Sequence, residues 1–268
     1  MNIYSKNDIV KSLVKVGIKK NDTIFVNPEI YRFGIYQNSK NLNYFKDFYE
    51  ILKKIIGANG TICLNTYTFN TLRNKETFNY NSFKTTSGRL SQIILQDKNK
   101  IRSIHPVFSV SAVGKKAKYI CKNNSRHNYG YNSPYWKMLK CNCKIISLGM
   151  DPWINPFNHI AEYFSGVPYY YNKFTNVKYL INKQVKNETY SSFVRFKNFN
   201  LVSNYNLIKK ELKKKNLIKK QKLGDGFIYS INSKKYFDVA LELLSKNQFA
   251  FIEEKFYLKY IKKTKNNF

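Results

Sequence analysis

The sequence predicts a mixed α/β fold, because short apolar segments of strand type alternate along the chain with segments of helical periodicity. The 268 residues are 43% hydrophobic and 16% aromatic, which supplies a sizeable core and excludes a disordered chain. No long linker, internal repeat or low-complexity block interrupts the pattern. We therefore expect one domain over residues 1–268, with a smaller β-rich subdomain at 167–205.

A helix is expected near the start of the chain, because Ser5 and Asp8 have the spacing of a capping box and Gly17 supplies a stop. A short apolar strand follows at 23–26. Residues 42–56 then have the periodicity of an amphipathic helix, and the glycine that follows them ends it.

The middle of the chain carries the remaining core strands. Apolar or alternating patterns predict strands at 60–64, 107–113 and 144–148, and Ser87 is expected to cap a helix between the first two of these. Residues 173–200 are polar and β-like, which indicates hairpins.

Helices are expected again toward the C-terminus. Ser133 followed by Pro134 is a cap and first-turn signal, which favours a structural role for both residues. Residues 207–223 read as a basic amphipathic helix, and residues 233–246 as a final helix with one apolar face.

The charge balance is strongly positive, with 47 Lys and Arg against 16 Asp and Glu and a formal net charge of +31. A composition rich in Lys, Asn and Ile is typical of AT-rich coding, which accounts for much of this magnitude. The sign still favours anionic ligands over cationic ones, since such a surface attracts anions within about 8 Å at physiological salt.

The sequence predicts a cytoplasmic protein without a metal site. No apolar run approaches about 18 residues, so no membrane span is expected, and the N-terminus lacks the pattern of a signal peptide. Cys141 and Cys143 have no second Cys/His pair at zinc-finger spacing. We expect all four cysteines to be reduced thiols and no metal to be bound.

His159 is the strongest candidate for a catalytic group. Asn155 and Pro156 have the identities of a cap and a first helical residue, directly after the loop that follows the 144–148 strand. His159 and Glu162 then lie three residues apart on one helix face, where the carboxylate would fix the imidazole tautomer. This is the arrangement of a general-base dyad, although such a pair also occurs on ordinary helix surfaces.

A series of motifs around this pair resembles the antibiotic N-acetyltransferase family, the aminoglycoside 3-N-acetyltransferases and their relatives. The similarity covers nearly the whole chain, from Gly17 to the last helix, and its motifs occur in the family's order. They are Ser87-Gly-Arg-Leu90, Ile101-Arg-Ser-Ile-His-Pro106, Ser109-x-Ser-Ala-x-Gly114, Gly130-Tyr-Asn-Ser-Pro134, Leu148-Gly149 and His159-Ile-Ala-Glu162.

The resemblance implies an acyltransferase that uses acetyl-CoA, with a three-layer fold in which helices cover both faces of a mixed central sheet. It maps the catalytic histidine onto His159 and its partner onto Glu162. Members of the family usually have Val-His-Ser-Ser after the first strand, lining the coenzyme pocket, whereas this chain has Val26-Asn-Pro-Glu29. The location of this segment carries over, but its contacts do not.

Two sets of binding residues are expected on the same basis. Arg102 is suited to bidentate contact with phosphate, and His105 either shapes the coenzyme pocket or is a buried structural histidine. His127 is expected to be a loop residue. The coenzyme set is Asn27, Arg102, Ser103, His105 and Ser109. The acceptor set is Thr66, Tyr169, Tyr170 and Tyr171.

The acceptor is expected to be a nucleotide-linked amino sugar. Between Asp97 and Glu188 the only acids are Asp151 and Glu162, which is a poor environment for a polycationic aminoglycoside. A nucleotide offers a pyrophosphate to Lys or Arg and a base for aromatic stacking. The stretch from Gly166 to Phe174 also resembles family members from surface-polysaccharide gene clusters. We therefore expect N-acetylation of a dTDP- or UDP-linked amino-deoxyhexose for glycan assembly.

Three alternatives stay open. The first is an aminoglycoside 3-N-acetyltransferase that confers antibiotic resistance. The second is a nucleic-acid-binding protein, supported by the net charge and the basic 209–222 segment but not by any recognised binding module. The third is a family member that has lost activity, suggested by the changed segment after Val26. The oligomeric state is also left open, with a homo-oligomer among the possibilities.

Overall fold

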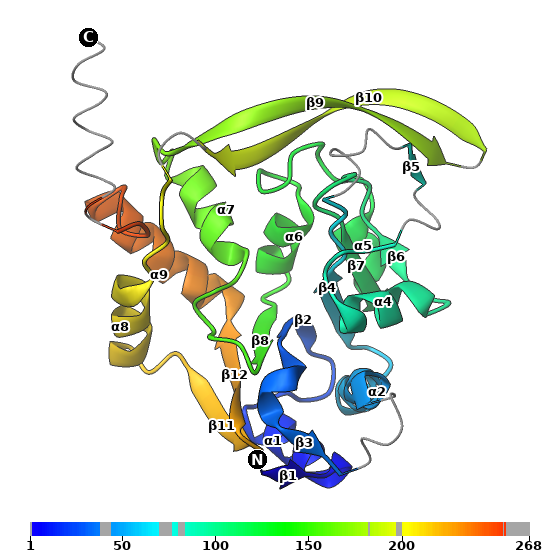
Figure 1. The fold of residues 1–268 in the computed structure, drawn as a ribbon, viewed down its shortest axis with the longest axis vertical. Helices are drawn as coiled ribbons and strands as arrows, with labels where there is room; N and C mark the ends of the chain where they lie inside the picture. The colour runs from blue at the N-terminus through cyan, green and yellow to red at the C-terminus, as the bar shows by residue number, and fades with distance from the viewer. Residues whose placement is uncertain are drawn as a thin grey trace.

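The computed structural model describes residues 2–37, 44–69, 77–79, 84–181, 183–196, 200–253 and 255. Its centre is a seven-stranded sheet (Figure 1). In spatial order the strands are β11 (Lys219–Leu223), β12 (Gly226–Asn232), β8 (Lys144–Leu148), β2 (Thr23–Pro28), β4 (Thr61–Asn65), β7 (Val110–Gly114) and β6 (Ile101–Arg102).

The sheet is mixed. β2 pairs in parallel with β4 on one side and β8 on the other, whereas the strands outside this trio are antiparallel to their neighbours. Successive side chains on β2 point to opposite faces, so Phe25 enters one core while Ile24 and Val26 enter the other. The expected mixed central sheet with a core on each face is confirmed.

Helices cover both faces and complete three layers (Figure 1). One face carries α1 (Lys6–Lys15), η1 (Ile30–Phe33), α2 (Tyr44–Ile56) and α4 (Arg89–Gln96). The other carries α5 (Ala117–Cys121), α6 (Pro134–Lys140), α7 (Phe157–Phe164), α8 (Asn206–Lys214) and α9 (Ser233–Lys246).

A long hairpin forms a second sheet. β9 (Tyr170–Ile181) and β10 (Gln184–Arg195) pair over their full length, and β5 (Phe78–Asn79) adds to β9 in parallel. The hairpin arches past α7 and α6 toward β5 at the top of Figure 1. The two remaining short strands, β1 (Ile3–Tyr4) and β3 (Ile35–Tyr36), pair with each other.

Two of the local predictions are wrong. Ser87 does not cap α4, because its hydroxyl accepts the Tyr67 backbone N–H at 2.9 Å and Gly88 occupies the cap position. The helix expected over 207–223 ends at Lys214. Asn216 has φ 52°, and the bonds Asn216 N–H to Lys213 O and Leu217 N–H to Leu212 O turn the chain into β11.

The other elements lie close to their predicted positions. Ser5 and Asp8 form the expected capping box, and Ser133 caps α6 by accepting the Trp136 N–H. The start of the helix expected at 42–56 falls partly on residues outside the described set. No helix in the described residues combines the length and the apolar character needed to cross a bilayer.

Gly149 fixes the turn from β8 into the loop before α7, and its substitution tests that constraint. It has φ 77°, and a Cβ here would collide with the backbone oxygen of Glu29. We expect Gly149→Ala to lower the free energy of unfolding by more than the roughly 1–2 kcal/mol of left-handed strain alone. Gly57→Ala is the matched control, since Gly57 has φ 68° but open space around it. Urea unfolding measures the free energy of unfolding of both variants. Equal losses of stability in the two would show that no collision occurs at Gly149.

Candidate active site

His159 and Glu162 lie on α7, which starts just after the carboxyl end of β8. The Asn155 side chain accepts the Phe157 N–H at 2.8 Å, so it supports the first turn as predicted, although the helix begins one residue later than expected. The helix ends in a left-handed Gly166, with Val167 N–H bonded to Glu162 O. That turn sends the chain back toward the helix and into β9.

The predicted pair is formed. His159 Nδ1 lies 2.7 Å from Glu162 Oε2, and the Tyr169 hydroxyl donates to Glu162 Oε1 at 3.0 Å. The Glu162 side chain is fully buried, whereas that of His159 is 29% exposed. Because an ionised carboxylate only accepts hydrogen bonds, Nδ1 carries the proton and the lone pair is on Nε2. The basic nitrogen of the imidazole is therefore Nε2, the ring nitrogen that does not contact Glu162.

Tyr170 and Arg195 extend this network from the hairpin. They face each other across β9 and β10, and Arg195 Nε donates to the Tyr170 hydroxyl at 2.9 Å. The same hydroxyl lies 3.1 Å from His159 Nδ1. The Arg195 guanidinium also lies over the Tyr170 ring, 5.4 Å from its centroid. The hairpin thus brings a cation close to the buried dyad.

The electrostatics of this network keep both tyrosines neutral. Burial, followed by the nearby Glu162 charge, raises the pKa of Tyr169 and of Tyr170. Burial alone lowers the pKa of Arg195, but Tyr170 and Glu162 outweigh it and the net shift is upward. Arg195 therefore stays charged and offsets part of the negative charge of Glu162.

The structure brings together only some of the residues that were predicted to bind the acceptor substrate. Tyr169 and Tyr170 contact the dyad, but Tyr171 points the other way along β9, is 37% exposed and stacks on Phe196 at 4.7 Å. Thr66 lies in a separate buried cluster, where its hydroxyl is 3.0 Å from that of Ser111. Acceptor binding by these residues stays a prediction.

The predicted coenzyme residues are held in place by internal hydrogen bonds. Arg102 is 3% exposed and donates to the Ser109 hydroxyl at 3.0 Å and to Thr66 O at 2.8 Å. Ser103 accepts the Val110 N–H at 2.8 Å. Asn27 donates to Ile154 O at 2.6 Å and so fastens the loop that leads to α7. These contacts show a structural role for each side chain, and coenzyme binding by them remains a prediction.

His105 and His127 share one arrangement. In each ring, Nδ1 accepts the backbone N–H groups of the residues two and three positions later, at 3.1–3.2 Å. Their Nε2 atoms face Ser191 O and Asn172 Oδ1, both on the hairpin. Burial lowers the pKa of His105 to about 4 and also lowers that of His127. Both are neutral turn-forming groups that hold the hairpin.

Arg195 and Tyr129 were not predicted as site residues. The Tyr129 ring lies 5.3 Å from that of His159, and Arg195 acts through Tyr170. The available signal for Arg195 was its rarity, because the cations of this chain are mostly lysine. Nothing in the sequence around Tyr129 distinguishes it from the other tyrosines.

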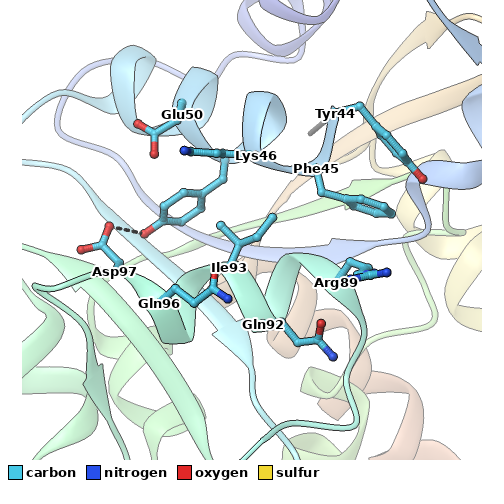
Figure 2. Close-up of a pocket in the computed structure, with 10 residues that line it drawn as sticks. Tyr44, Phe45, Lys46, Glu50, Arg89, Gln92, Ile93, Gln96 and Asp97 are labelled. Atoms are coloured by element: carbon cyan, nitrogen blue, oxygen red, sulfur yellow. Dashed lines mark hydrogen bonds between the residues drawn. The ribbon is translucent and has the colours of Figure 1, made fainter. Parts of the chain in front are cut away.

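A cavity of about 730 Å³ lies between α2 and α4, on the opposite face of the sheet (Figure 2). Tyr44, Phe45, Arg89 and Gln92 line it, and the Tyr49 hydroxyl donates to Asp97 at 2.8 Å at one end. No predicted site residue lines this cavity. We therefore assign the candidate site from the geometry around His159 and not from the size of a cavity. Among the described residues, no group of three or more His, Cys, Asp or Glu side chains could hold a metal ion.

Comparison with known protein families identifies the family of this chain. The model of the aminoglycoside 3-N-acetyltransferase family matches residues 37–245. The chain belongs to this family. It is therefore an acyl-CoA-dependent N-acyltransferase. No curated protein sequence matches the chain closely enough to count as a relative.

Solved structures show the same fold. The binary complex of AAC-IIIb with CoASH has a TM-score of 0.76 at 16% identity, covering 91% of this chain and 97% of that one. A histidine-to-alanine mutant of AAC(3)-IVa in complex with a gentamicin has a TM-score of 0.77 at 20% identity, covering 94% and 92%. YokD from Bacillus subtilis has a TM-score of 0.74 at 18% identity, covering 90% and 99%.

The neutral state of His105 predicts a loss of stability in mild acid. Its pKa falls from 6.5 unfolded to about 4 folded, so the unfolded chain binds the proton more readily. The stabilisation is complete above pH 6.5 and is lost progressively as the pH falls toward about 4. His127 contributes in the same direction.

His105→Asn tests this assignment, because an amide oxygen can replace Nδ1 as the acceptor but does not titrate. We expect urea unfolding of the variant to depend less steeply on pH between 6.5 and 4 than unfolding of the wild type. Parallel pH profiles for the two proteins would show that His105 is not the titrating group.

Proposed function

We propose that the protein is an acetyl-CoA-dependent N-acetyltransferase in which His159 Nε2 is the general base. The observation that carries the proposal is the 2.7 Å contact between His159 Nδ1 and the fully buried Glu162. It holds the tautomer in which Nε2 accepts a proton. Family membership and a structural relative in complex with CoASH support acetyl-CoA as the donor.

The chemistry needs a neutral amine more than it needs leaving-group protonation. Acetyl-CoA supplies a thioester, whose C–S bond breaks as the new C–N bond forms, and thiolate leaves readily because a thiol has a pKa of about 8.5. His159 removes the proton that the amine loses on attack. Glu162 stabilises the imidazolium that forms, and Tyr169 keeps the carboxylate oriented.

We propose an amino sugar as the acceptor, and two kinds are each favoured by an observation. Aminoglycosides are favoured by the family and by the AAC(3)-IVa mutant solved with a gentamicin. A dTDP- or UDP-linked amino-deoxyhexose for surface glycan synthesis is favoured by the local charge. Glu162 is already bonded to His159 and Tyr169, Glu188 pairs with Arg126 at 2.5 Å, and Arg195 adds a cation beside the site.

Replacement of the base is the first test. We expect His159→Ala to lower kcat by about 10²–10⁴, the usual contribution of a general base. Glu162→Gln should lose less, because the amide oxygen still accepts the Nδ1 proton while the charge is gone. Release of free CoA thiol from acetyl-CoA measures both rates, and circular dichroism confirms that the variants are folded. Full activity in His159→Ala would contradict the proposed base.

The choice of acceptor is a separate prediction. A panel of kanamycin- and gentamicin-type aminoglycosides is compared with dTDP- and UDP-linked amino sugars in the same thiol-release assay. If the local charge governs the choice, kcat/KM is expected to be at least about tenfold higher on a nucleotide-linked sugar. Turnover confined to aminoglycosides would overturn the charge argument and assign the other kind of acceptor.

A further inference from the structure

A second cavity, of about 510 Å³, lies between α8, the β11–β12 hairpin and the loop that leads from β8 to α7. We call it the α8 pocket. Its volume is within the range of small-molecule sites. Its lining residues are Asp151, Trp153, Lys209, Lys213, Asn216, Ile218, Lys220 and Tyr229.

Positive charge dominates the α8 pocket. Lys209 and Lys213 are one helical turn apart on α8, and Lys220 enters from β11 opposite Tyr229. None of these lysines forms an ion pair with a carboxylate among the described residues, and Asp151 is the one acid in the lining. Like charges gathered around a hollow repel one another, and a bound anion would relieve that repulsion.

Aromatic rings lie beside these cations. Lys209 Nζ is 4.7 Å from the Trp153 ring centroid. Lys220 Nζ is 5.8 Å from the Tyr229 centroid and 3.6 Å from that of Phe227, a ring just outside the lining. Ammonium groups next to flat rings match a ligand that combines phosphate with a stacking base. An inorganic anion would leave the rings unused.

The pocket is mechanically connected to the catalytic helix. Trp153 O accepts from the Asn158 side chain at 2.7 Å, and the Tyr236 hydroxyl lies 2.6 Å from Asn158 Oδ1. Asn158 directly precedes His159. Asn27 fastens the same loop through Ile154 O. A ligand seated against Trp153 therefore rests on the segment that positions the base.

We infer that the α8 pocket binds a nucleoside phosphate. The inference rests on the proposed acetyl transfer for the source of that ligand, which is either the 3′-phosphoadenosine end of the coenzyme or the nucleotide of a nucleotide-linked acceptor. Both present phosphate to Lys209, Lys213 and Lys220 and a base to Trp153 or Tyr229. The two sources are separated by which nucleotide binds.

Tryptophan fluorescence measures this binding directly. The chain has two tryptophans. Trp136 on α6 packs against Tyr131 and Phe164, away from the pocket lining. Trp136→Phe therefore leaves Trp153 as the only tryptophan reporter. This protein is titrated with adenosine 3′,5′-bisphosphate, dTDP, UDP and unphosphorylated adenosine. We expect saturable quenching by adenosine 3′,5′-bisphosphate if the coenzyme is the source, or by dTDP or UDP if the acceptor is. Adenosine should bind much more weakly.

The lysines are tested by two double variants of equal charge. Lys209→Ala with Lys213→Ala should raise Kd at least about tenfold. Lys210→Ala with Lys214→Ala removes the same charge from α8 outside the pocket and should change Kd by less than about twofold. Equal weakening in both, or no saturable quenching by any phosphate, would overturn the inference. The His159→Ala variant should bind the nucleotide with unchanged Kd. Nucleotide binding can therefore be tested even if the proposed acetyl transfer fails.

Discussion

The structure around the site depends on one buried negative charge, the carboxylate of Glu162. A carboxylate with no exposure is tolerated only when its oxygens are hydrogen-bonded and its charge is offset. His159 and Tyr169 provide the hydrogen bonds, and Arg195 provides the offsetting charge through Tyr170. Removal of one partner from such a buried charge typically costs about 3–5 kcal/mol, so folding and site assembly are coupled here.

That requirement explains why a hairpin outside the central sheet is fixed so firmly over α7. β10 is tied to the 126–130 segment by Ser191 N–H to Arg126 O and by Phe193 N–H to Asn128 Oδ1. His105 and His127 reach the same hairpin through Nε2 while their Nδ1 atoms close turns. These histidines can do both only as neutral rings, because a second ring proton would remove the acceptor.

Local sequence signals predicted the elements whose formation is local. The helix start near Asn155, the helix spacing of His159 and Glu162 and the apolar strands were all readable, since each depends on neighbours a few residues away. The cap itself is one residue off, because Pro156 and not Asn155 occupies that position. The misses depend on distant partners. Arg195 gains its role only from its register opposite Tyr170, and the Ser87 hydroxyl is taken by Tyr67. The sequence pattern of residues 207–223 stays helical throughout. The helix nevertheless ends before Asn216, which has a left-handed conformation, and the residues that follow form β11 and pair with β12.

The broken helix also changes the meaning of the positive charge. A nucleic-acid-binding surface was suggested by a continuous basic helix over 209–222, which would present its lysines along one extended face. The turn at Asn216 instead places Lys209 and Lys213 on α8 and Lys220 on a strand, around a hollow that contains Trp153 and Tyr229. A polynucleotide backbone needs an extended track of cations, whereas a converging set beside two rings suits a single nucleotide. The same lysines therefore favour a small ligand next to the loop that leads to α7 over a polymer on the surface.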